Sequence, residues 1–143
     1  MKLGITGTRN GFTKNQLNAF KTVFKDLQKE GVDEFHQGQC IGVDVESAEW
    51  INTFTKGAIP IHSHPPLKQE LVGECHVDVV LPKKNYFARN RDIVHASDVL
   101  LACTPTEDEQ SNGGTWYTYR YAIDNGYKVI LITPSGKVSY HNF

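Results

Sequence analysis

Short apolar segments alternate along the chain with longer segments in which apolar residues recur at helical spacing. The first long segment begins after Thr13, whose side chain is a good N-terminal cap, and it ends at Gly31, which permits a left-handed stop. Gly57 and Gly126 end two later segments in the same way. The apolar residues that repeat at helical spacing in the first segment are Leu17, Phe20, Val23, Phe24 and Leu27.

The same pattern predicts the remaining elements. Helices are expected around residues 48–51, at 86–96 and at about 115–125. Strands alternating with helices indicate βαβ units, with parallel pairing and right-handed crossovers. We therefore expect an α/β fold, a doubly wound Rossmann-like parallel sheet in a single domain of residues 1–143. Strands are predicted at residues 3–6, 32–36, 58–62, 99–103, 127–132 and, as an antiparallel C-terminal edge, 137–140, while residues 77–81 form either a strand or a buried segment.

Composition and charge narrow the class of protein. The 143 residues are 39% hydrophobic and 22% charged, as in a soluble globular domain. A net charge of −1 gives no global positive field, so an anion needs a local site and nucleic acid is an unlikely partner. Cys40, Cys75 and Cys103 show no disulfide framework, and no segment has the pattern of a signal peptide or a membrane span. We expect a cytoplasmic protein with no membrane partner.

Three glycine-rich turns lie where a predicted strand leads into a predicted helix. They are Gly7-Thr8-Arg9, the loop from Gly38 to Gly42, and Gly113-Gly114-Thr115. In open parallel sheets, ligands bind beyond the carboxyl ends of the strands, where helix N-termini offer unpaired N–H groups and a partial positive charge. Together the three turns predict an anion-binding crevice for a phosphate or a ribose.

Five motifs spread over nearly the whole chain carry a family resemblance. They are the run from Gly4 to Arg9, the loop from Gly38 to Asp44, His64-Pro65-Pro66, the segment from Tyr86 to Val94 before Ser97-Asp98, and Gly113-Gly114-Thr115-Trp116. These motifs resemble the SLOG superfamily, which includes YspA-like and phage-encoded proteins, the Rossmann domain of DNA-processing protein A, and cytokinin-activating phosphoribohydrolases. The resemblance implies phosphate-binding turns at residues 7–9, 38–44 and 113–115. It also aligns residues 89–91 with the Arg-Asn-Arg of DNA-processing protein A.

One departure from the family pattern concerns catalysis. The phosphoribohydrolases carry a catalytic Glu one or two positions after their Gly-Thr, whereas Trp116 follows Thr115 here. No carboxylate that would stabilise an oxocarbenium-like ribose stands at the expected place, so we assign no catalytic residue. If the protein is a hydrolase, Asp44 is the first candidate, ahead of Glu46 and Glu49. Capping of a helix explains Asp44 equally well.

Arginine and aromatic side chains are further candidates for ligand contact. Arg9 and Arg89 suit bidentate binding of phosphate, whereas Arg91 suits a structural ion pair. One predicted helix carries several aromatic rings that, with Tyr86, suit stacking of a nucleobase or, more commonly, a core or an interface; they are Trp116, Tyr117, Tyr119 and Tyr121. Trp116 and Tyr119 lie three residues apart on one face, and this aromatic-rich helix is a candidate dimer seam. We expect a homo-oligomer.

The histidines do not predict a metal site from their spacing. His62, His64, Cys75 and His76 are of the residue types that bind zinc, but no second compact pair completes a tetrahedral set. A loop at His64-Pro65-Pro66 that walls a ligand pocket is the preferred interpretation. We expect neither a metal nor a cofactor.

These observations favour a binding protein over an enzyme. We expect it to sense or sequester a nucleotide or nucleotide-derived small molecule, and the resemblance to phage-encoded SLOG proteins implies a signal such as a cyclic ADP-ribose isomer in phage defence. The alternatives are an N-glycoside hydrolase or phosphoribohydrolase acting on nucleoside monophosphates, and a single-stranded DNA-binding protein. The predicted ligand-binding residues are Gly7, Thr8, Arg9, Gln39, Cys40, Gly42, Asp44, His64, Pro65, Arg89, Asn90, Gly113, Gly114 and Thr115.

Overall fold

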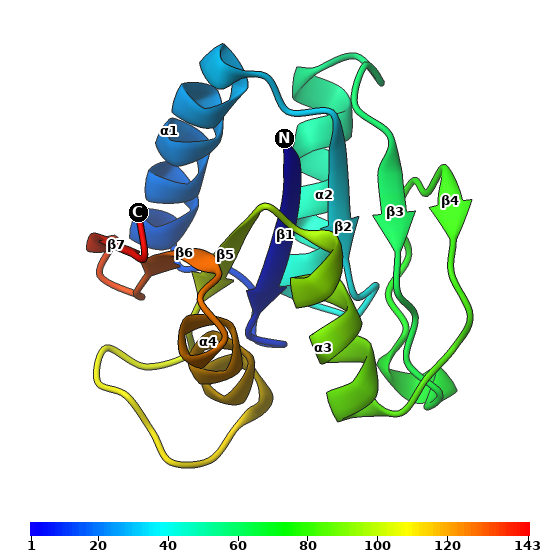
Figure 1. Ribbon diagram of the computed structural model, residues 1–143. Helices are drawn as coiled ribbons and strands as arrows, with labels where there is room; N and C mark the ends of the chain where they lie inside the picture. Colours follow the sequence, from blue (N-terminus) through cyan, green and yellow to red (C-terminus); the bar gives the residue numbers. More distant parts are fainter.

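The apolar strands assemble into one seven-stranded sheet in the computed structural model, which describes residues 1–143 (Figure 1). The strands are β1 (Lys2–Gly7), β2 (Glu34–Gln37), β3 (Ile61–Ser63), β4 (Val79–Val80), β5 (Val99–Cys103), β6 (Lys128–Ile132) and β7 (Val138–His141). Their order across the sheet is β4-β3-β2-β1-β5-β6-β7, and only the β6–β7 pair is antiparallel. The predicted parallel sheet with an antiparallel C-terminal edge is confirmed.

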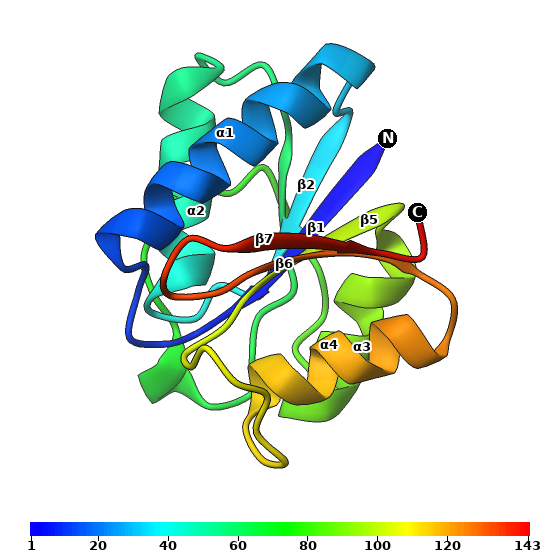
Figure 2. The ribbon, with the colours of Figure 1, turned by 90° about the vertical axis from the view of Figure 1, so that its left-hand side faces the viewer.

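Helices cover both faces of this sheet. They are α1 (Lys14–Glu30), α2 (Val43–Phe54), α3 (Tyr86–Ala96) and α4 (Gly114–Asp124), with a short 3-10 turn, η1 (Gln69–Leu71). Seen from the β7 edge, α1 and α2 lie on one side of the sheet and α3 and α4 on the other (Figure 2). This two-sided cover is the doubly wound arrangement that the sequence pattern predicts. No helix is both long enough and apolar enough to cross a membrane.

Local capping chemistry sets several helix boundaries where the sequence predicts them. The Thr13 hydroxyl accepts a hydrogen bond from the backbone N–H of Gln16 at 3.0 Å, which fixes the start of α1. Gly31, at a φ of 96°, ends that helix. At α3, the Asn85 side chain accepts from the N–H of Ala88 at 3.0 Å.

Two hydrophobic cores lie on opposite faces of the sheet. Leu3 and Ile5 of β1 pack with Phe35 in the core beneath α1 and α2. Leu100 and Ala102 of β5 pack in the smaller core beneath α3 and α4. Successive residues of a strand point to opposite faces, so a fully buried strand such as β5 contributes to both cores.

Trp116 and Tyr119 belong to the second of these cores. Both side chains are buried among residues of α3, β5 and β6. These two rings therefore pack in the core and not at a dimer seam, whereas Tyr117 and Tyr121 of the same helix are only partly buried.

Two predicted strands differ from the structure. The strand expected at residues 58–62 begins at Ile61, because Pro60 has no N–H to donate to a neighbouring strand. Residues 77–81 form a strand only at Val79–Val80, and both residues are exposed at the sheet edge. Their interpretation as a buried segment is wrong, since no further strand or helix covers that edge.

The chain leaves two adjacent central strands toward opposite faces of the sheet. After β1 it passes to α1 on one face, and after β5 it passes to α4 on the other. Loops that diverge at neighbouring carboxyl ends leave a crevice between them, and this is where open α/β sheets bind ligands. The loops after Gly7 and Cys103 are therefore the expected location of a ligand-binding site.

Candidate functional site

An open pocket of about 340 Å³ lies at this divergence between β1 and β5. One wall is the loop that follows β1 and the other is the start of α4. The volume falls within the range of about 300–1,000 Å³ that is usual for small-molecule sites. The residues that line it are Gly7, Thr8, Arg9, Tyr86, Pro105, Gly113, Gly114, Thr115 and Trp116.

The start of α4 supplies unpaired donors to this pocket. Gly113 is the N-cap residue at a φ of 93°, and no side chain caps the helix. The first backbone hydrogen bond of α4 runs from the N–H of Tyr117 to the carbonyl of Gly113, so the preceding N–H groups have no partner within the helix. No acidic residue lies in the first turn. An anion placed here meets N–H groups and the positive end of the helix dipole.

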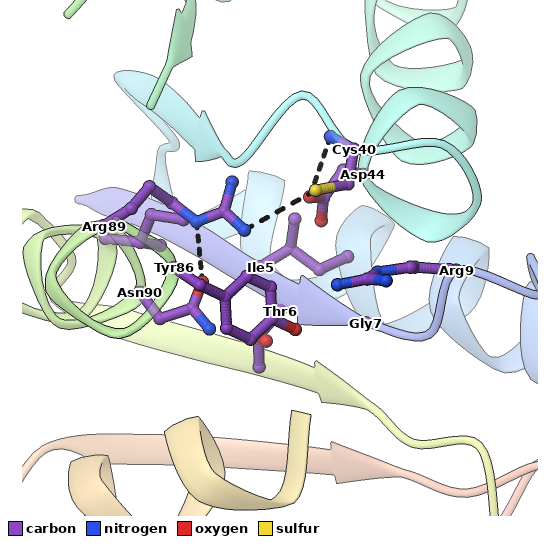
Figure 3. Close-up of a pocket in the computed structure, with 10 residues that line it drawn as sticks. Ile5, Thr6, Gly7, Arg9, Cys40, Asp44, Tyr86, Arg89 and Asn90 are labelled. Atoms are coloured by element: carbon purple, nitrogen blue, oxygen red, sulfur yellow. Dashed lines mark hydrogen bonds between the residues drawn. The ribbon is translucent and has the colours of Figure 1, made fainter. Parts of the chain in front are cut away.

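Arg9 provides the positive charge on the opposite wall. Its side chain is exposed and makes no hydrogen bond or ion pair, so its guanidinium is free to bind a ligand. The guanidinium carbon lies 5.4 Å from the centre of the Tyr86 ring. The buried Arg89 faces the same ring at 5.2 Å, and Figure 3 shows Tyr86 between the two arginines. Cation–π contacts of this kind hold an aromatic ring in place.

Gly114 shapes the pocket by admitting the Tyr86 ring. A β-carbon at Gly114 would overlap the Tyr86 hydroxyl and the neighbouring ring carbons. The absence of a side chain at Gly114 therefore allows α3 and α4 to bring Tyr86 against the first turn of α4.

A second, inner recess lies behind Tyr86 and is lined by the buried side chains of Arg89 and Asp44. Arg89 donates to the carbonyl of Gly38 at 2.6 Å and to that of His64 at 3.1 Å. It also donates to the Asn90 side chain at 2.7 Å and contacts the Cys40 sulfur at 3.5 Å (Figure 3). Arg89 thus makes its hydrogen bonds to the protein itself, while its guanidinium faces the Tyr86 ring.

Asp44 is the acidic side chain that lines this recess. Its carboxylate accepts from the backbone N–H of Cys40 at 3.3 Å. Burial raises the pKa of Asp44 to about 6, although the Arg89 charge and the N–H groups of Cys40 and Gly38 act in the opposite direction. Burial likewise raises the pKa of the Cys40 thiol. The recess measures about 10 Å³, which is room for roughly one water molecule.

The glycine turn from Gly38 to Gly42 packs behind the loop that follows β1. A β-carbon at Gly42 would lie 2.5 Å from the carbonyl oxygen of Thr8, and the N–H of Val43 donates to that oxygen at 3.1 Å. Asp44 and Glu46 already occupy the first turn of α2. Two of the three predicted turns therefore line the open pocket, whereas the start of α2 supports the β1 loop from behind.

The remaining predicted residues line neither the pocket nor the recess. Gln39 accepts from the Ser63 hydroxyl and donates to the carbonyl of Gly73 at 3.4 Å, which ties the β2–α2 loop to its neighbours. The His64 Nε2 lies 2.8 Å from the His36 Nδ1, and burial lowers the pKa of His64 to about 4. Pro65 is buried beside it.

The structure also adds residues to the predicted set. Tyr86 and Trp116 line the open pocket, although the sequence indicates them only as candidate stacking rings, and Pro105 joins them from the loop after β5. A sequence signal for Tyr86 is available, because it lies three residues before the predicted ligand-binding residue Arg89 and residues three apart share a helix face. No sequence signal marks Pro105.

Comparison with models of protein families finds no match, and comparison with curated proteins finds none. Among solved structures, an X-ray structure of TM1055 matches with a TM-score of 0.59 at 17% identity, over 94% of this chain and 75% of that chain. A structure of DNA processing protein A from Helicobacter pylori, determined to study its single-stranded DNA binding mode, matches with a TM-score of 0.58 at 22% identity. That match covers 92% of this chain and 64% of the DNA processing protein A chain. The chain shares its Rossmann-like fold with both proteins.

Proposed function

We propose that the protein binds a nucleotide or a nucleotide-derived small molecule in the pocket between the β1 loop and the start of α4, without chemical change to the ligand. The observation that carries the proposal is that the free guanidinium of Arg9 and the uncapped N-terminus of α4 face the same pocket. A phosphate is the group that best satisfies both a guanidinium and a set of backbone N–H groups.

The neighbouring surface has room for the rest of a nucleotide. A second pocket of about 350 Å³ shares Arg9 and Tyr86 with the first and continues along Pro66, Leu67 and Leu71. Its apolar lining suits a nucleobase, and the Tyr86 ring separates it from the phosphate side. This arrangement supports a ligand whose anionic part lies at α4 and whose base lies beyond Tyr86.

The class of ligand follows from the family resemblance. The glycine turns at residues 7–9 and 113–115 resemble those of SLOG proteins, some of which are phage-encoded. We propose membership of that superfamily and capture of an NAD-derived signal such as a cyclic ADP-ribose isomer in phage defence. ADP-ribose is the available probe for this class.

The position of Asp44 supports binding over hydrolysis. A glycosidase carboxylate must reach the reacting sugar, whereas Asp44 lies in a recess with room for about one water molecule. The hydrolase alternative is tested by incubating the protein with AMP and NAD and measuring released base by chromatography. Release that Asp44→Asn abolishes would establish the hydrolase and overturn the proposal of unchanged binding.

Single-stranded DNA is a second candidate ligand. The fold is similar to that of a protein described as binding single-stranded DNA, and an exposed arginine beside an aromatic ring suits base stacking. The expectation that nucleic acid is an unlikely partner gains no support from this comparison. Titration with an oligothymidylate at several salt concentrations tests it, because backbone binding weakens steeply as salt increases.

Calorimetric titration with ADP-ribose and AMP tests the proposed function. We expect binding of one ligand per chain and a loss of at least about tenfold in affinity for Arg9→Ala, the size of one charge-assisted contact. Lys25→Ala is the matched control, because it removes one positive charge from α1, which does not line the pocket. Absence of binding to the native protein, or equal losses in the two variants, would contradict the proposal.

A further inference from the structure

A cluster of metal-ligand side chains lies on the sheet away from the nucleotide pocket. Glu34 and His36 are two residues apart on β2 and so share one face of the strand. His62 is the register partner of His36 across the β2–β3 pair, and their ring centres are 4.6 Å apart. The parallel register thus brings His62 beside Glu34 and His36, from which the sequence separates it.

The ligand atoms of these three side chains converge. One nitrogen or oxygen from each lies within 4.8 Å of the others. The His36 Nε2 is 2.8 Å from Glu34 Oε1, and the His62 Nε2 is 3.5 Å from Glu34 Oε2. In a four-coordinate zinc site with bonds near 2.0–2.2 Å, neighbouring ligand atoms lie about 3.4 Å apart. Small side-chain rotations therefore suffice to surround an ion.

Solvent reaches the cluster from one side. In Figure 1, α3 lies in front of β1 and β2, and no helix covers the front of β3. The His62 side chain is 18% exposed and that of Glu34 is 23% exposed, whereas His36 is buried. An ion can enter from this side and keep a water molecule as its remaining ligand.

His64 orients the central ligand. The His36 Nδ1 lies 2.8 Å from the His64 Nε2, so the ring of His36 is held with its Nε2 toward Glu34. When an ion takes the Nε2 lone pair, His36 carries its hydrogen on Nδ1 and donates it to His64, whose own hydrogen then lies on Nδ1. Metal-binding histidines usually have an outer partner of this kind.

We propose that Glu34, His36 and His62 bind one divalent transition-metal ion, with zinc as the ion whose ligand preferences they match. Two imidazoles and one carboxylate are a zinc ligand set that leaves a fourth position for water. The proposal is independent of the nucleotide pocket, which these residues do not line. The proposal replaces the expectation of no metal. Spacing along the chain does not show that His36 and His62 are neighbours, because they are brought together by the register between β2 and β3.

Substitution of Lys2 should strengthen zinc binding, whereas loss of a ligand should weaken it. The Lys2 ammonium lies 3.7 Å from Glu34 Oε1 and its side chain is 56% exposed. It competes with a cation for the carboxylate and repels a bound ion. Lys2→Gln should therefore tighten zinc binding by up to about fivefold, the effect of one unit charge at this distance in a water-like dielectric.

The experiment is calorimetric titration of the untagged full chain with Zn²⁺, with Co²⁺ absorption as a probe of coordination. We expect one ion per chain and the visible bands of four-coordinate cobalt. His62→Ala should weaken zinc binding by at least about tenfold. His95→Ala removes an imidazole from the end of α3, outside the cluster, and should change nothing.

Three results would overturn the proposal. They are no zinc binding by the native chain, equal binding by native protein and His62→Ala, and a loss in His95→Ala as large as in His62→Ala. Lys2→Gln keeps the test decisive if His62→Ala fails to fold, because an unchanged or weaker affinity in that variant also contradicts the assignment.

Discussion

Tyr86 is the residue on which the shape of the proposed nucleotide pocket depends most directly. Arg9 and Arg89 face its ring, and the backbone of Gly114 lies against its edge. These contacts join the β1 loop, α3 and α4, which are far apart in sequence. Sequence alone therefore indicates Tyr86 only as one of several candidate rings, because the contact that distinguishes it is made by packing of two helices.

Substitution of Gly114 by Ala should be costly only while the Tyr86 ring is present. The added methyl group overlaps that ring, and overpacking of this kind costs about 1–3 kcal/mol of unfolding free energy. In a Tyr86→Ala background the space is free, so the same substitution should cost close to nothing. Urea unfolding of the four proteins measures this, and equal costs in both backgrounds would show that the ring and the glycine do not interact.

Asp44 should make stability depend on pH in an unusual direction. Its folded-state pKa of about 6 lies above the ordinary value of 3.8, so the folded protein binds more protons between these values. The free energy of unfolding contributed by Asp44 therefore falls as pH rises from about 4 to about 6, and by pH 7 the loss is about 3 kcal/mol. The positive charge of Arg89 acts against this rise in pKa but does not offset the effect of burial.

Asp44→Asn isolates this contribution. The amide of Asn differs from the protonated carboxyl by an amount that does not depend on pH, and the attraction of Arg89 for the ionised carboxylate is already contained in the folded-state pKa. Relative to the native protein, the variant should therefore gain stability as pH rises from 4.5 to 7.5. Urea unfolding at both values measures the difference. A difference that is the same at both pH values would contradict a raised pKa.

At the scale of elements, the uncapped start of α4 is the feature that a ligand would complete. Asn112 is exposed directly before the cap residue Gly113, which lines the pocket. Asn112→Asp places a negative charge beside the positive helix end, an interaction of about 0.3–1 kcal/mol. It should compete with an anionic ligand and weaken ADP-ribose binding by about two- to fivefold.

Asn18→Asp is the matched control for this change. It adds the same charge on the exposed surface of α1, away from the pocket, and should leave the affinity unchanged. Calorimetric titration compares the two variants. Equal affinities in both would indicate that the ligand does not bind at the start of α4.

Element boundaries follow from the sequence where the determining contact is local. Thr13 and Gly31 mark α1, and Asn85 marks α3, because each caps its own helix. The late start of the strand expected at 58–62 is also local, because Pro60 cannot donate to a neighbouring strand. The segment at 77–81 was less predictable, since its extent depends on pairing with β3 and on the lack of cover at the sheet edge, which no local pattern records.

At the scale of the whole molecule, strand order decides where the candidate site lies. Because β1 and β5 are adjacent and send the chain to opposite faces, Gly7 and Gly114 meet at one pocket, as alternating strands and helices predict. The start of α2 did not join them, since Gly42 packs against the Thr8 carbonyl. The meeting of His36 with His62 depends on inter-strand register, which spacing along a single chain does not reveal.

The expectation of a homo-oligomer remains a prediction for the whole molecule. Trp116 and Tyr119 are buried in the chain's own core, so an oligomer has to use other residues. Sedimentation velocity over a range of concentrations tests it. We expect a species larger than the 16.1 kDa chain, and a single species of that mass at every concentration would contradict the expectation.

The most direct measurement is a nuclear magnetic resonance titration of ¹⁵N-labelled protein with ADP-ribose. We expect the largest amide shift changes on two segments, residues 7–9 after β1 and residues 113–116 at the start of α4, and we expect Arg9→Ala to reduce both sets together. Changes confined to any other part of the sheet, or no changes up to millimolar ligand, would contradict this prediction.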